Sequence, residues 1–528
     1  MRPRLTQLYP FLIAIIPILN FAGSNPSAFK AKDLAFTIAV AVVWCAAVHL
    51  LALLVIGRRG PPALVPFVVL LAVGWFYGYG LLVGKLSPDK TRPHHALVLA
   101  GLVLLGTGLL LWIRRRERLL DGVARFFALM GTLLVSWGLF RIGIGWIRGM
   151  QAVEESALVS ELARPIETAG QARRPMRDIY FIVLDEYPNS EVLRERFKYD
   201  NRPFEDSLRA LGFQVPHRVQ SNYLHTLLSL PSVLNAVHMT GLEGELGPKA
   251  TSPAVPNHLL EHHRVAAFLK GHGYRYLFFP SQWWHSTRSS EVADVVFHPY
   301  HGFQLTRALS EGELQRALRT RSALRYLDPD HGWEADHVRR TMEGLAQVPQ
   351  APGPVFVFAH VLKPHSPFVF HRGCETVRRQ QRSEDIGGPY LEQLECVNRM
   401  LLATVRRILR DSRVPPIILL QGDHGTNLLD ATGFARADQV PPEAARERFG
   451  ALGAYYLPDG GAAAFGDTVT LVNVLGNVLR YYLGADLPRA ADEQYISPAD
   501  FPYAFRKVDA RWLAGDDSAG VTALGAGR

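Results

Sequence analysis

Long apolar stretches fill the chain before about residue 150 and constrain its fold more than any other feature. They run over Leu8–Phe21, Leu34–Ile56, Ala63–Val83, Ala96–Ile113 and Phe126–Ile147. Most approach the ~20 apolar residues that an α-helix needs to cross a bilayer. The first contains Pro10 and Pro17, and a cleaved signal peptide is its alternative, although it ends without a convincing small-residue cleavage site. The sequence predicts a bundle of five transmembrane helices in residues 1–149.

Basic residues flank these stretches unevenly. Arg2 and Arg4 precede the first stretch, Arg58 and Arg59 follow the second, and an arginine-rich run at 114–118 follows the fourth. Because positive loops stay in the cytoplasm, an odd number of spans places the rest of the chain on the other side. We therefore expect a multi-pass protein of the cell (inner) membrane whose larger part is periplasmic or extracellular.

The scarcity of ionisable side chains well inside the stretches indicates a membrane anchor rather than a transporter. His49 is the ionisable residue of note well inside a stretch, and no pair of buried charges marks an ion pathway. The chain carries a formal net charge of +9. Its arginines lie on membrane flanks and amphipathic segments rather than among aromatics on one stripe, so we expect no nucleic-acid partner.

The rest of the chain has a mixed globular composition. Residues 150–177 are polar and interrupted by Pro165 and Pro175, which predicts a stalk. Residues 178–490 predict an exported α/β domain with a mostly parallel central sheet, because apolar runs of strand length alternate with helical patterns. The predicted strands are Asp178–Leu184, Tyr274–Phe279, Val355–Val361, Pro416–Leu420 and Ala454–Leu457. Residues 491–528 are expected to form a C-terminal tail.

Polar side chains capable of binding metal follow several of these strands. In an open α/β sheet, ligands bind at the carboxyl ends of the strands. Asp185 and Glu186 follow the first strand, His360 lies near the end of the third with Lys363 and His365 beyond it, and Asp423 and His424 follow the fourth. Carboxylate and imidazole side chains together suit a divalent cation such as Zn²⁺ or Mn²⁺. The pattern predicts a metal site that assists ester chemistry, although a polar turn explains each residue taken alone.

A hydroxyl nucleophile is also available. The segment 221–232 offers Thr226, Ser229 and Ser232, and a Thr before an apolar helix also commonly serves as its N-cap. A Thr hydroxyl has too high a pKa to attack at neutral pH unless a metal ion or a base activates it.

Taken together, these motifs resemble the alkaline phosphatase/sulfatase superfamily, specifically its membrane-anchored phosphoethanolamine and phosphoglycerol transferases, such as lipid A phosphoethanolamine transferases and lipoteichoic acid synthases. The resemblance is carried by Asp185, by Thr226 in a Thr-x-x-Ser-x-Pro motif, by His360 and His365, and by Asp423-His424-Gly425. The predicted helices followed by an exported α/β domain extend it over nearly the whole chain.

The resemblance implies a function and a set of roles. Thr226 would be the nucleophile and a metal ligand, and Asp185, Asp423 and His424 would complete the first metal site. His360 and His365 would bind the phosphoryl group or a second ion. The ion would be Zn²⁺ or Mn²⁺, the donor a membrane phospholipid, and the acceptor an envelope glycan or lipid. Lys363 would add a positive charge for the phosphoryl oxygens, with a solvated surface lysine as its alternative.

The sequence departs from the family pattern in several places. The transferases usually carry Glu where Asp185 stands, so Glu186 remains an alternative ligand. Some relatives have a further His about a dozen residues beyond the Asp-His pair, and 435–439 contains none. Sulfatases require a Cys/Ser-x-Pro-x-Arg pattern, whereas 229–233 reads Ser-Leu-Pro-Ser-Val and lacks the Arg.

Other interpretations remain open at this point. A periplasmic phosphodiesterase or sulfuric ester hydrolase would use the same residues with water as acceptor, and a catalytically silent membrane scaffold would keep only the fold. Cys374 and Cys396 lie in the exported part, where they form either a disulfide or two free thiols.

Overall fold

The structure is a computed structural model that describes residues 5–26, 29–56, 63–86, 92–113, 116–169, 175–281, 287, 290–298, 313–324, 332–377, 386–513 and 520–523. The chain divides into two compact units. One, called here the helical unit, comprises Met1–Gly149 and Gly302–Pro329. The other, called the α/β unit, comprises Met150–His301 and Asp330–Arg528.

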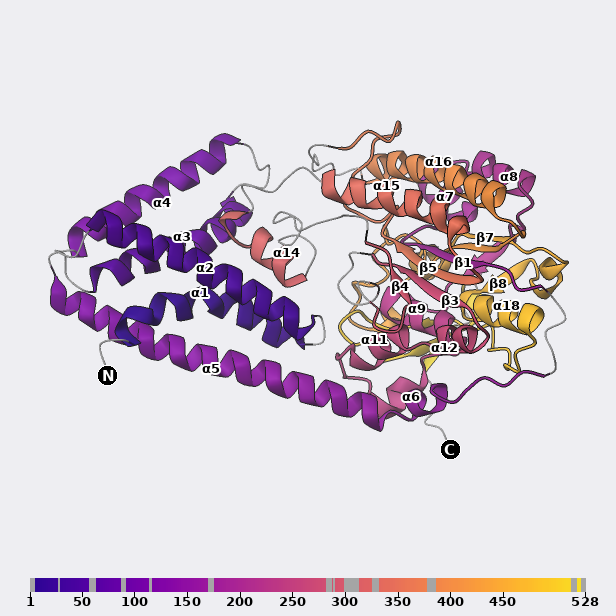
Figure 1. The fold of residues 1–528 in the computed structure, drawn as a ribbon, viewed down its shortest axis with the longest axis horizontal. Coiled ribbons are helices and arrows are strands. Elements are labelled where there is room, and N and C mark those ends of the chain that lie inside the picture. Colours follow the sequence, from indigo (N-terminus) through magenta and orange to yellow (C-terminus); the bar gives the residue numbers. More distant parts are fainter. Residues whose placement is uncertain are drawn as a thin grey trace. The chain divides into compact units, whose positions relative to one another are not determined.

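Each predicted apolar stretch of the helical unit forms a helix (Figure 1): α1 (Leu5–Ser24), α2 (Ala31–Ile56), α3 (Leu64–Leu86), α4 (Arg92–Ile113) and α5 (Glu117–Glu155). Four of the described helices, α1, α2, α4 and α5, are long and apolar enough to cross a membrane. In α3 the apolar segment is shorter, Leu64–Gly80. The flanking arginines Arg2, Arg4, Arg58, Arg59, Arg114 and Arg115 lie outside the described residues.

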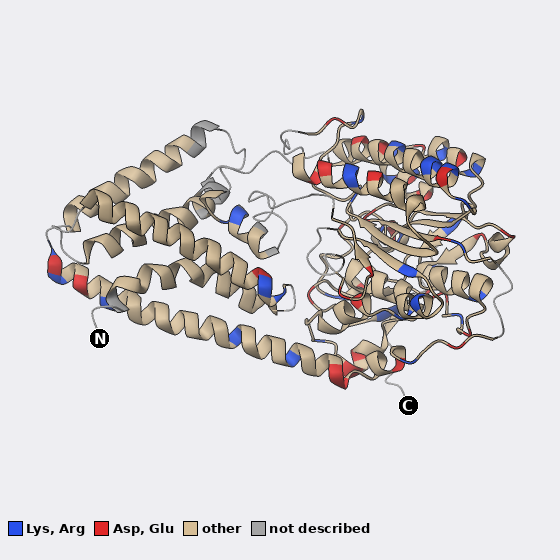
Figure 2. Cartoon of the chain, in the orientation of Figure 1, with Lys and Arg blue, Asp and Glu red and all other residues tan. Residues whose placement is uncertain are grey.

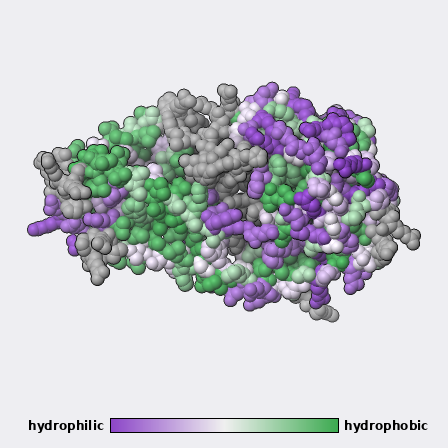
Figure 3. Space-filling model, in the orientation of Figure 1, coloured by the Kyte–Doolittle hydropathy of each residue, from purple (hydrophilic) through white to green (hydrophobic). Residues whose placement is uncertain are grey.

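The surface of the helical unit is apolar, as expected of a lipid-facing bundle. Large side chains such as Leu54, Leu104 and Leu133 are more than half exposed. Figure 2 shows few charged residues on α1 to α4, and Figure 3 shows hydrophobic residues gathered over these helices. Such an exposed apolar surface is stable in lipid but not in water.

Helix α5 packs closely on α1 through small residues. A Cβ atom on Gly131 would lie 3.1 Å from Leu12 Cβ, and one on Gly138 would lie 2.8 Å from Leu19 Cβ. Small residues let membrane helices approach closely enough for van der Waals packing. Arg141, an ionisable residue within the predicted fifth span that our sequence analysis missed, donates to Asn20 Oδ1 at 3.3 Å and to Ser24 Oγ at 3.2 Å, at the end of α1.

A short helix from the middle of the chain belongs to the helical unit, which the sequence analysis did not predict. Helix α14 (Glu313–Thr320) buries Leu314 and Leu318. The backbone that follows it passes so close to α3 that a Cβ on Gly80 would lie 2.4 Å from the carbonyl carbon of Arg321. Only glycine tolerates that approach.

The α/β unit is built around a six-stranded sheet in the order β4-β3-β5-β1-β6-β7. Its strands are β1 (Ile179–Leu184), β3 (Arg275–Phe279), β4 (Val295–Val296), β5 (Val355–Val361), β6 (Ile417–Gly422) and β7 (Gly453–Tyr456). All neighbours pair in parallel except β6 and β7, which are antiparallel. The prediction of a mostly parallel sheet is confirmed.

Helices cover both faces of this sheet (Figure 1). Alternate residues of β1 enter different cores, because successive side chains of a strand point to opposite faces. The helices of the unit are α6 (Ala157–Leu162), α7 (Ser190–Phe197), α8 (Arg202–Ala210), α9 (Thr226–Asn235), α10 (Gly241–Leu246), α11 (Ala254–Glu261), α12 (Arg264–Gly271), α15 (Gly332–Gln347), α16 (Gly387–Asp411), α17 (Pro442–Phe449), α18 (Val474–Leu483) and α19 (Ala510–Leu513). Phe181 and Val183 pack in the core formed with α9, α11, α12 and α18, whereas Tyr180 and Ile182 pack in the core formed with α7, α8, α15 and α16.

The expected stalk and tail are more structured than predicted. Helix α5 continues without a break to Glu155, and Leu158 and Leu162 of α6 are buried in the α/β unit. The expected tail forms β9 (Tyr495–Ile496), β10 (Arg506–Val508) and β11 (Val521–Ala523), and its Tyr503 and Phe505 are fully buried. Two short strands, β2 (Arg218–Gln220) and β8 (Thr468–Thr470), pair separately. Cys374 and Cys396 form a disulfide.

Candidate active site and metal centre

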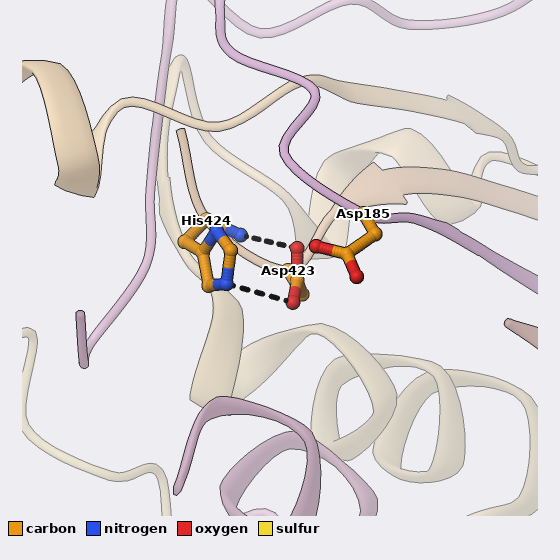
Figure 4. A group of neighbouring side chains, drawn as sticks. All are labelled: Asp185, Asp423 and His424. Atoms are coloured by element: carbon orange, nitrogen blue, oxygen red, sulfur yellow. Dashed lines mark hydrogen bonds and ion pairs between the residues drawn. The ribbon is translucent and has the colours of Figure 1, made fainter. Parts of the chain in front are cut away.

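The register of the parallel strands brings the predicted metal ligands together. In β1, Leu184 pairs with Gly422 of β6 on one side and with Val361 of β5 on the other. Asp185 and Asp423, the next residues along β1 and β6, therefore start from neighbouring positions. Asp185, Asp423 and His424 are all buried, and each offers a ligand atom within 4.8 Å of the others. In Figure 4 the Asp185 carboxylate faces that of Asp423. The Asp423 carboxylate in turn contacts His424 through the backbone N–H and through Nε2 of the ring.

The glycines around the Asp-His pair are required by close approach of other segments. A Cβ on Gly422 would lie 2.2 Å from the Tyr187 carbonyl oxygen, and a Cβ on Gly425 would lie 2.0 Å from that of Glu447. Neither distance is compatible with a side chain. These residues let the segments at 187 and 447 pack against the pair.

Thr226 carries the hydroxyl that reaches this group. It is the first residue of α9, and its Oγ1 donates to Asp423 Oδ2 at 2.6 Å and lies 2.9 Å from His424 Nε2. The N-cap position belongs to His225, so Thr226 is not the N-cap that we considered as an alternative. Ser229 Oγ instead donates to the Asp423 backbone carbonyl at 2.7 Å, and Ser232 Oγ donates to the Ser229 carbonyl. Of the candidate hydroxyls, that of Thr226 is the one beside the carboxylate.

The donor set fits a divalent metal ion. Asp423 Oδ2 and His424 Nε2 lie 3.1 Å apart, and both accept hydrogen bonds here, from Thr226 and Arg448 respectively, so each atom has a lone pair that a metal ion could bind. Ligand atoms of a tetrahedral zinc site, each ~2.0–2.2 Å from the ion, lie roughly 3.3 Å apart. Among the described residues, the buried Asp185 Oδ1 atom has no hydrogen-bond partner. Asp185, Asp423 and His424 thus have the chemistry and the spacing of a metal site, and the Thr226 hydroxyl lies beside the last two.

Electrostatics in the site point the same way. Burial and the neighbouring Glu186 carboxylate raise the pKa of Asp185 to about 8. Burial and the Asp185 carboxylate raise the pKa of Asp423 well above its usual value. Burial and the Arg448 guanidinium lower the pKa of His424 well below its usual value, which keeps the imidazole neutral. Two buried carboxylates and a neutral imidazole are arranged as ligands for a cation.

Glu186, the alternative ligand, points elsewhere. Its carboxylate pairs with Arg448, with Oε1 2.7 Å from Nη1, and its other oxygen lies 4.0 Å from His365 Nε2. The backbone of Glu186 adopts a positive φ of 58° and its N–H donates to Asp423 Oδ1 at 3.2 Å. That left-handed turn separates the side chains of Asp185 and Glu186, and only Asp185 belongs to the buried group.

His360 and His365 lie at the rim of the group. His360 Nε2 is 3.9 Å from Asp185 Oδ2 and has no hydrogen-bond partner among the described residues, while its Nδ1 lies 2.6 Å from Thr287 Oγ1. Burial, with His365 nearby, lowers the pKa of His360 to about 3, so this imidazole is neutral. Thr287 was not predicted from the sequence, and no local motif marks it.

Lys363 is neither a solvated lysine nor a group turned freely toward substrate. It is 2% exposed, and its Nζ donates to the carbonyl oxygen of Pro367 at 2.9 Å and to that of His365 at 3.3 Å. Glu334 Oε2 lies 4.0 Å from the same atom. Lys363 therefore holds the loop that carries His365.

Arg448 is a second residue of the site that was not predicted from the sequence. It lies near the end of α17 and is 7% exposed. Its Nη2 donates to His424 Nε2 at 3.1 Å, and its Nη1 pairs with Glu186. In the sequence it stands in Arg-Glu-Arg-Phe on a short amphipathic helix, where arginines are usually solvated.

Comparison with known proteins gives matches to solved structures only. No family model and no curated protein matches the chain. The zinc complex of the C-terminal periplasmic domain of EcEptC from Escherichia coli matches with a TM-score of 0.44 and 11% identity over 68% of this chain and 99% of that one. The lipoteichoic acid synthase LtaP from Listeria monocytogenes matches with a TM-score of 0.39 and 10% identity over 65% of this chain and 86% of that one.

A putative sulfatase, yidJ from Bacteroides fragilis, matches with a TM-score of 0.39 and 12% identity over 64% of this chain and 85% of that one. These matches are structural and have low sequence identity. Because each TM-score lies below 0.5, the function of this chain has to be inferred from its own side chains.

Proposed function

We propose that this chain is a membrane-anchored, metal-dependent transferase that moves a phospholipid head group, phosphoethanolamine or phosphoglycerol, to a cell-envelope acceptor through a phosphothreonine intermediate. The observation that carries the proposal is the position of the Thr226 hydroxyl, 2.6 Å from Asp423 Oδ2 and 2.9 Å from His424 Nε2. A hydroxyl held among buried metal-ligand atoms at the carboxyl end of a parallel sheet is arranged for nucleophilic attack.

Asp185, Thr226, Asp423 and His424 would hold the ion, Zn²⁺ or Mn²⁺. When bound, it lowers the pKa of the Thr226 hydroxyl and neutralises the anionic phosphodiester. The protein fixes the ligands around that position. His424 Nδ1–H donates to the Gly425 carbonyl at 3.1 Å, which sets the tautomer and leaves Nε2 as the ligand atom. The N–H groups of Glu186 and His424 both donate to Asp423 Oδ1, which orients its carboxylate.

The reaction has two displacements. Thr226 Oγ1 attacks phosphorus, and its proton passes by way of Asp423 Oδ2 to the oxygen that links phosphorus to diacylglycerol; the bond from phosphorus to that oxygen breaks, and diacylglycerol leaves. A hydroxyl oxygen of the acceptor then attacks the phosphothreonine, and the bond from phosphorus to Thr226 breaks as the acceptor's proton moves to Thr226 Oγ1. His360 and His365, beside Asp185 and Glu186, would contact the phosphoryl oxygens or a second ion.

The helical unit supports a membrane substrate. Four of its described helices are long and apolar enough to span a bilayer. We propose that α3 is a fifth span, that the flanking arginines keep their loops in the cytoplasm, and that the α/β unit is therefore periplasmic or extracellular. A phospholipid donor of the outer leaflet would share that side of the membrane with the site.

Sulfatase chemistry is not favoured. The Ser that would occupy the reactive position of a sulfatase motif, Ser229, is buried and its Oγ donates to the Asp423 carbonyl, and no Arg follows at 233. A phosphodiesterase would use water in the second displacement.

Intact-mass measurement of the detergent-purified protein tests the proposal. The protein is incubated with phosphatidylethanolamine or phosphatidylglycerol and with Zn²⁺ or Mn²⁺. We expect a head-group adduct on the wild type and none on Thr226→Ala. Ser232→Ala is the matched control, since it removes another hydroxyl of α9, a buried one that does not reach the carboxylates, and it should keep the adduct.

The outcomes separate the alternatives. An adduct that decays in water as fast as with a glycan or lipid acceptor identifies a hydrolase. An adduct that persists on Thr226→Ala overturns the assignment of the nucleophile. Failure to bind metal with every ligand intact leaves the silent scaffold as the better description.

A further inference from the structure

Arg448 is built into the site rather than placed at its surface. Its Nε donates to the Leu224 carbonyl at 2.8 Å, and its Nη1 donates to the Gly425 carbonyl at 2.8 Å. Nη1 also pairs with Glu186 Oε1 at 2.7 Å. These bonds fix the planar guanidinium on three sides, and its remaining nitrogen, Nη2, points at His424.

The contact with His424 determines which imidazole nitrogen carries the proton. A guanidinium stays protonated and can only donate hydrogen bonds. His424 Nε2, 3.1 Å from Nη2, must therefore accept, and the proton resides on Nδ1, beside the Gly425 carbonyl. The Nε2 lone pair is thus engaged by Arg448.

Glu186 holds the guanidinium in that place. Its backbone is fixed by two hydrogen bonds, from its N–H to Asp423 Oδ1 at 3.2 Å and from Tyr390 Oη to its carbonyl at 2.8 Å. Its carboxylate, on the Arg448 side of the turn, balances the cation. The ion pair is part of the same framework that positions Asp423.

The Nε2 atom that Arg448 engages is the atom that a metal ion would require. We propose that Arg448 and a divalent metal ion are alternative partners of His424 Nε2, so that the Glu186–Arg448 ion pair sets the metal affinity of the site. This inference rests on the metal site of the proposed function. The positive charge of the guanidinium also repels a metal ion bound nearby, because charges a few Å apart interact strongly in a buried site.

Metal affinity, measured by equilibrium dialysis of the detergent-solubilised full chain with Mn²⁺ or Zn²⁺ at one pH, tests the inference. We expect Arg448→Gln to lower Kd by roughly tenfold or more, because it removes both the competing donor and a positive charge. Glu186→Gln should raise Kd, because it leaves Arg448 unbalanced. Arg448→Lys keeps the charge and should stay closer to the wild type than Arg448→Gln does.

Arg177→Gln is the matched control. Arg177 is also 7% exposed and pairs with Asp459, away from the described site residues, so its loss should leave Kd unchanged. If Arg448 only braced the surrounding loops, Arg448→Gln would loosen the ligands and raise Kd, which is the opposite sign. Should Arg448→Gln fail to fold, the rise in Kd of Glu186→Gln carries the test.

Loss of the metal site and loss of the Arg448 effect would give different results. If the wild type binds metal and Arg448→Gln binds it equally well or more weakly, the role of Arg448 is overturned while the metal site is retained. No metal binding by either protein overturns both. Binding by Arg448→Gln alone would be the strongest support for competition at Nε2.

Discussion

At the scale of single residues, Asp423 organises the site with all three of its oxygen atoms. Its Oδ1 accepts from the N–H groups of Glu186 and His424, its Oδ2 accepts from Thr226, and its carbonyl oxygen accepts from Ser221 and Ser229. A carboxylate held this way has one orientation, as a metal ligand requires.

Asp423→Asn separates metal binding from folding. An amide has the same shape, and its nitrogen in place of Oδ2 can donate to Thr226 Oγ1, which lies 2.6 Å from that position. We expect metal affinity to fall by roughly a hundredfold or more, since even changes outside the ligand shell cost 10–100-fold. Thermal unfolding in chelator should show no loss of stability, because a desolvated charge has been removed. Unchanged metal affinity would exclude Asp423 as a ligand.

His263, which is remote from the metal ligands, should make the free energy of unfolding depend on pH. It is 1% exposed at the N-cap of α12, where Nδ1 accepts from the Ala266 N–H at 3.1 Å. Burial lowers its pKa to about 3, below the ~6.5 of an unfolded chain. The unfolded state therefore binds a proton first, so the stability that His263 contributes is complete above pH ~6.5 and is lost as pH falls toward 3.

The difference between wild type and His263→Asn isolates this effect, because Asn is a good N-cap that does not titrate. Between pH 7 and pH 5 the wild type should lose about 2 kcal/mol more unfolding free energy than the variant. Denaturant unfolding at several pH values measures it, and parallel pH profiles for the two proteins would contradict the prediction.

Much of the site was predictable residue by residue, and the reason is the sheet. Parallel strands end at one edge, so Asp185 and Asp423 could be placed together from the apolar runs that precede them. Arg448 could not, because it reaches the site through the path of α17, and nothing in its local sequence distinguishes it from a solvated arginine. The left-handed turn at Glu186, which directs its side chain toward Arg448, could not be predicted from the sequence either.

At the scale of secondary-structure elements, hydrophobicity predicted the helices that form from long apolar runs. It did not predict the elements whose burial depends on a few side chains. Each apolar stretch became a helix. The expected tail instead packs Tyr503 and Phe505 into a core that includes Tyr223, far away in the sequence. Short β9 and β10 carry no periodic signal long enough to show this in advance.

The α1–α5 contact gives paired substitutions with opposite expected signs. Gly138→Ala would put a Cβ 2.8 Å from Leu19 Cβ, and such overpacking costs about 1–3 kcal/mol. Gly143→Ala in the same helix has no neighbouring atom within 4 Å and should gain up to ~1 kcal/mol of helix propensity. Thermal unfolding in detergent should show a lower midpoint for the first and an unchanged or higher one for the second. A common shift would mean that α5 does not pack on α1 there.

At the scale of the whole molecule, the chain divides its tasks between two units whose composition differs. The segment Gly302–Pro329 belongs to the helical unit although its neighbours in sequence belong to the α/β unit. Sequence patterns could not predict this exchange, because α14 reads as a short amphipathic helix that either unit could have buried.

All four proposed metal ligands, Asp185, Thr226, Asp423 and His424, lie in the α/β unit, so metal should stabilise that unit and leave the other unchanged. A ligand at 100 times its Kd stabilises the state that binds it by about 2.7 kcal/mol. Hydrogen exchange of the full chain, with Mn²⁺ or with chelator, should therefore show slower exchange in peptides that span 179–187, 223–230 and 417–426. Peptides of α1 to α4 should exchange at the same rate in both conditions. Asp423→Asn should abolish the difference, whereas slowing that persists in this variant, or that extends equally through α1 to α4, would place the metal elsewhere.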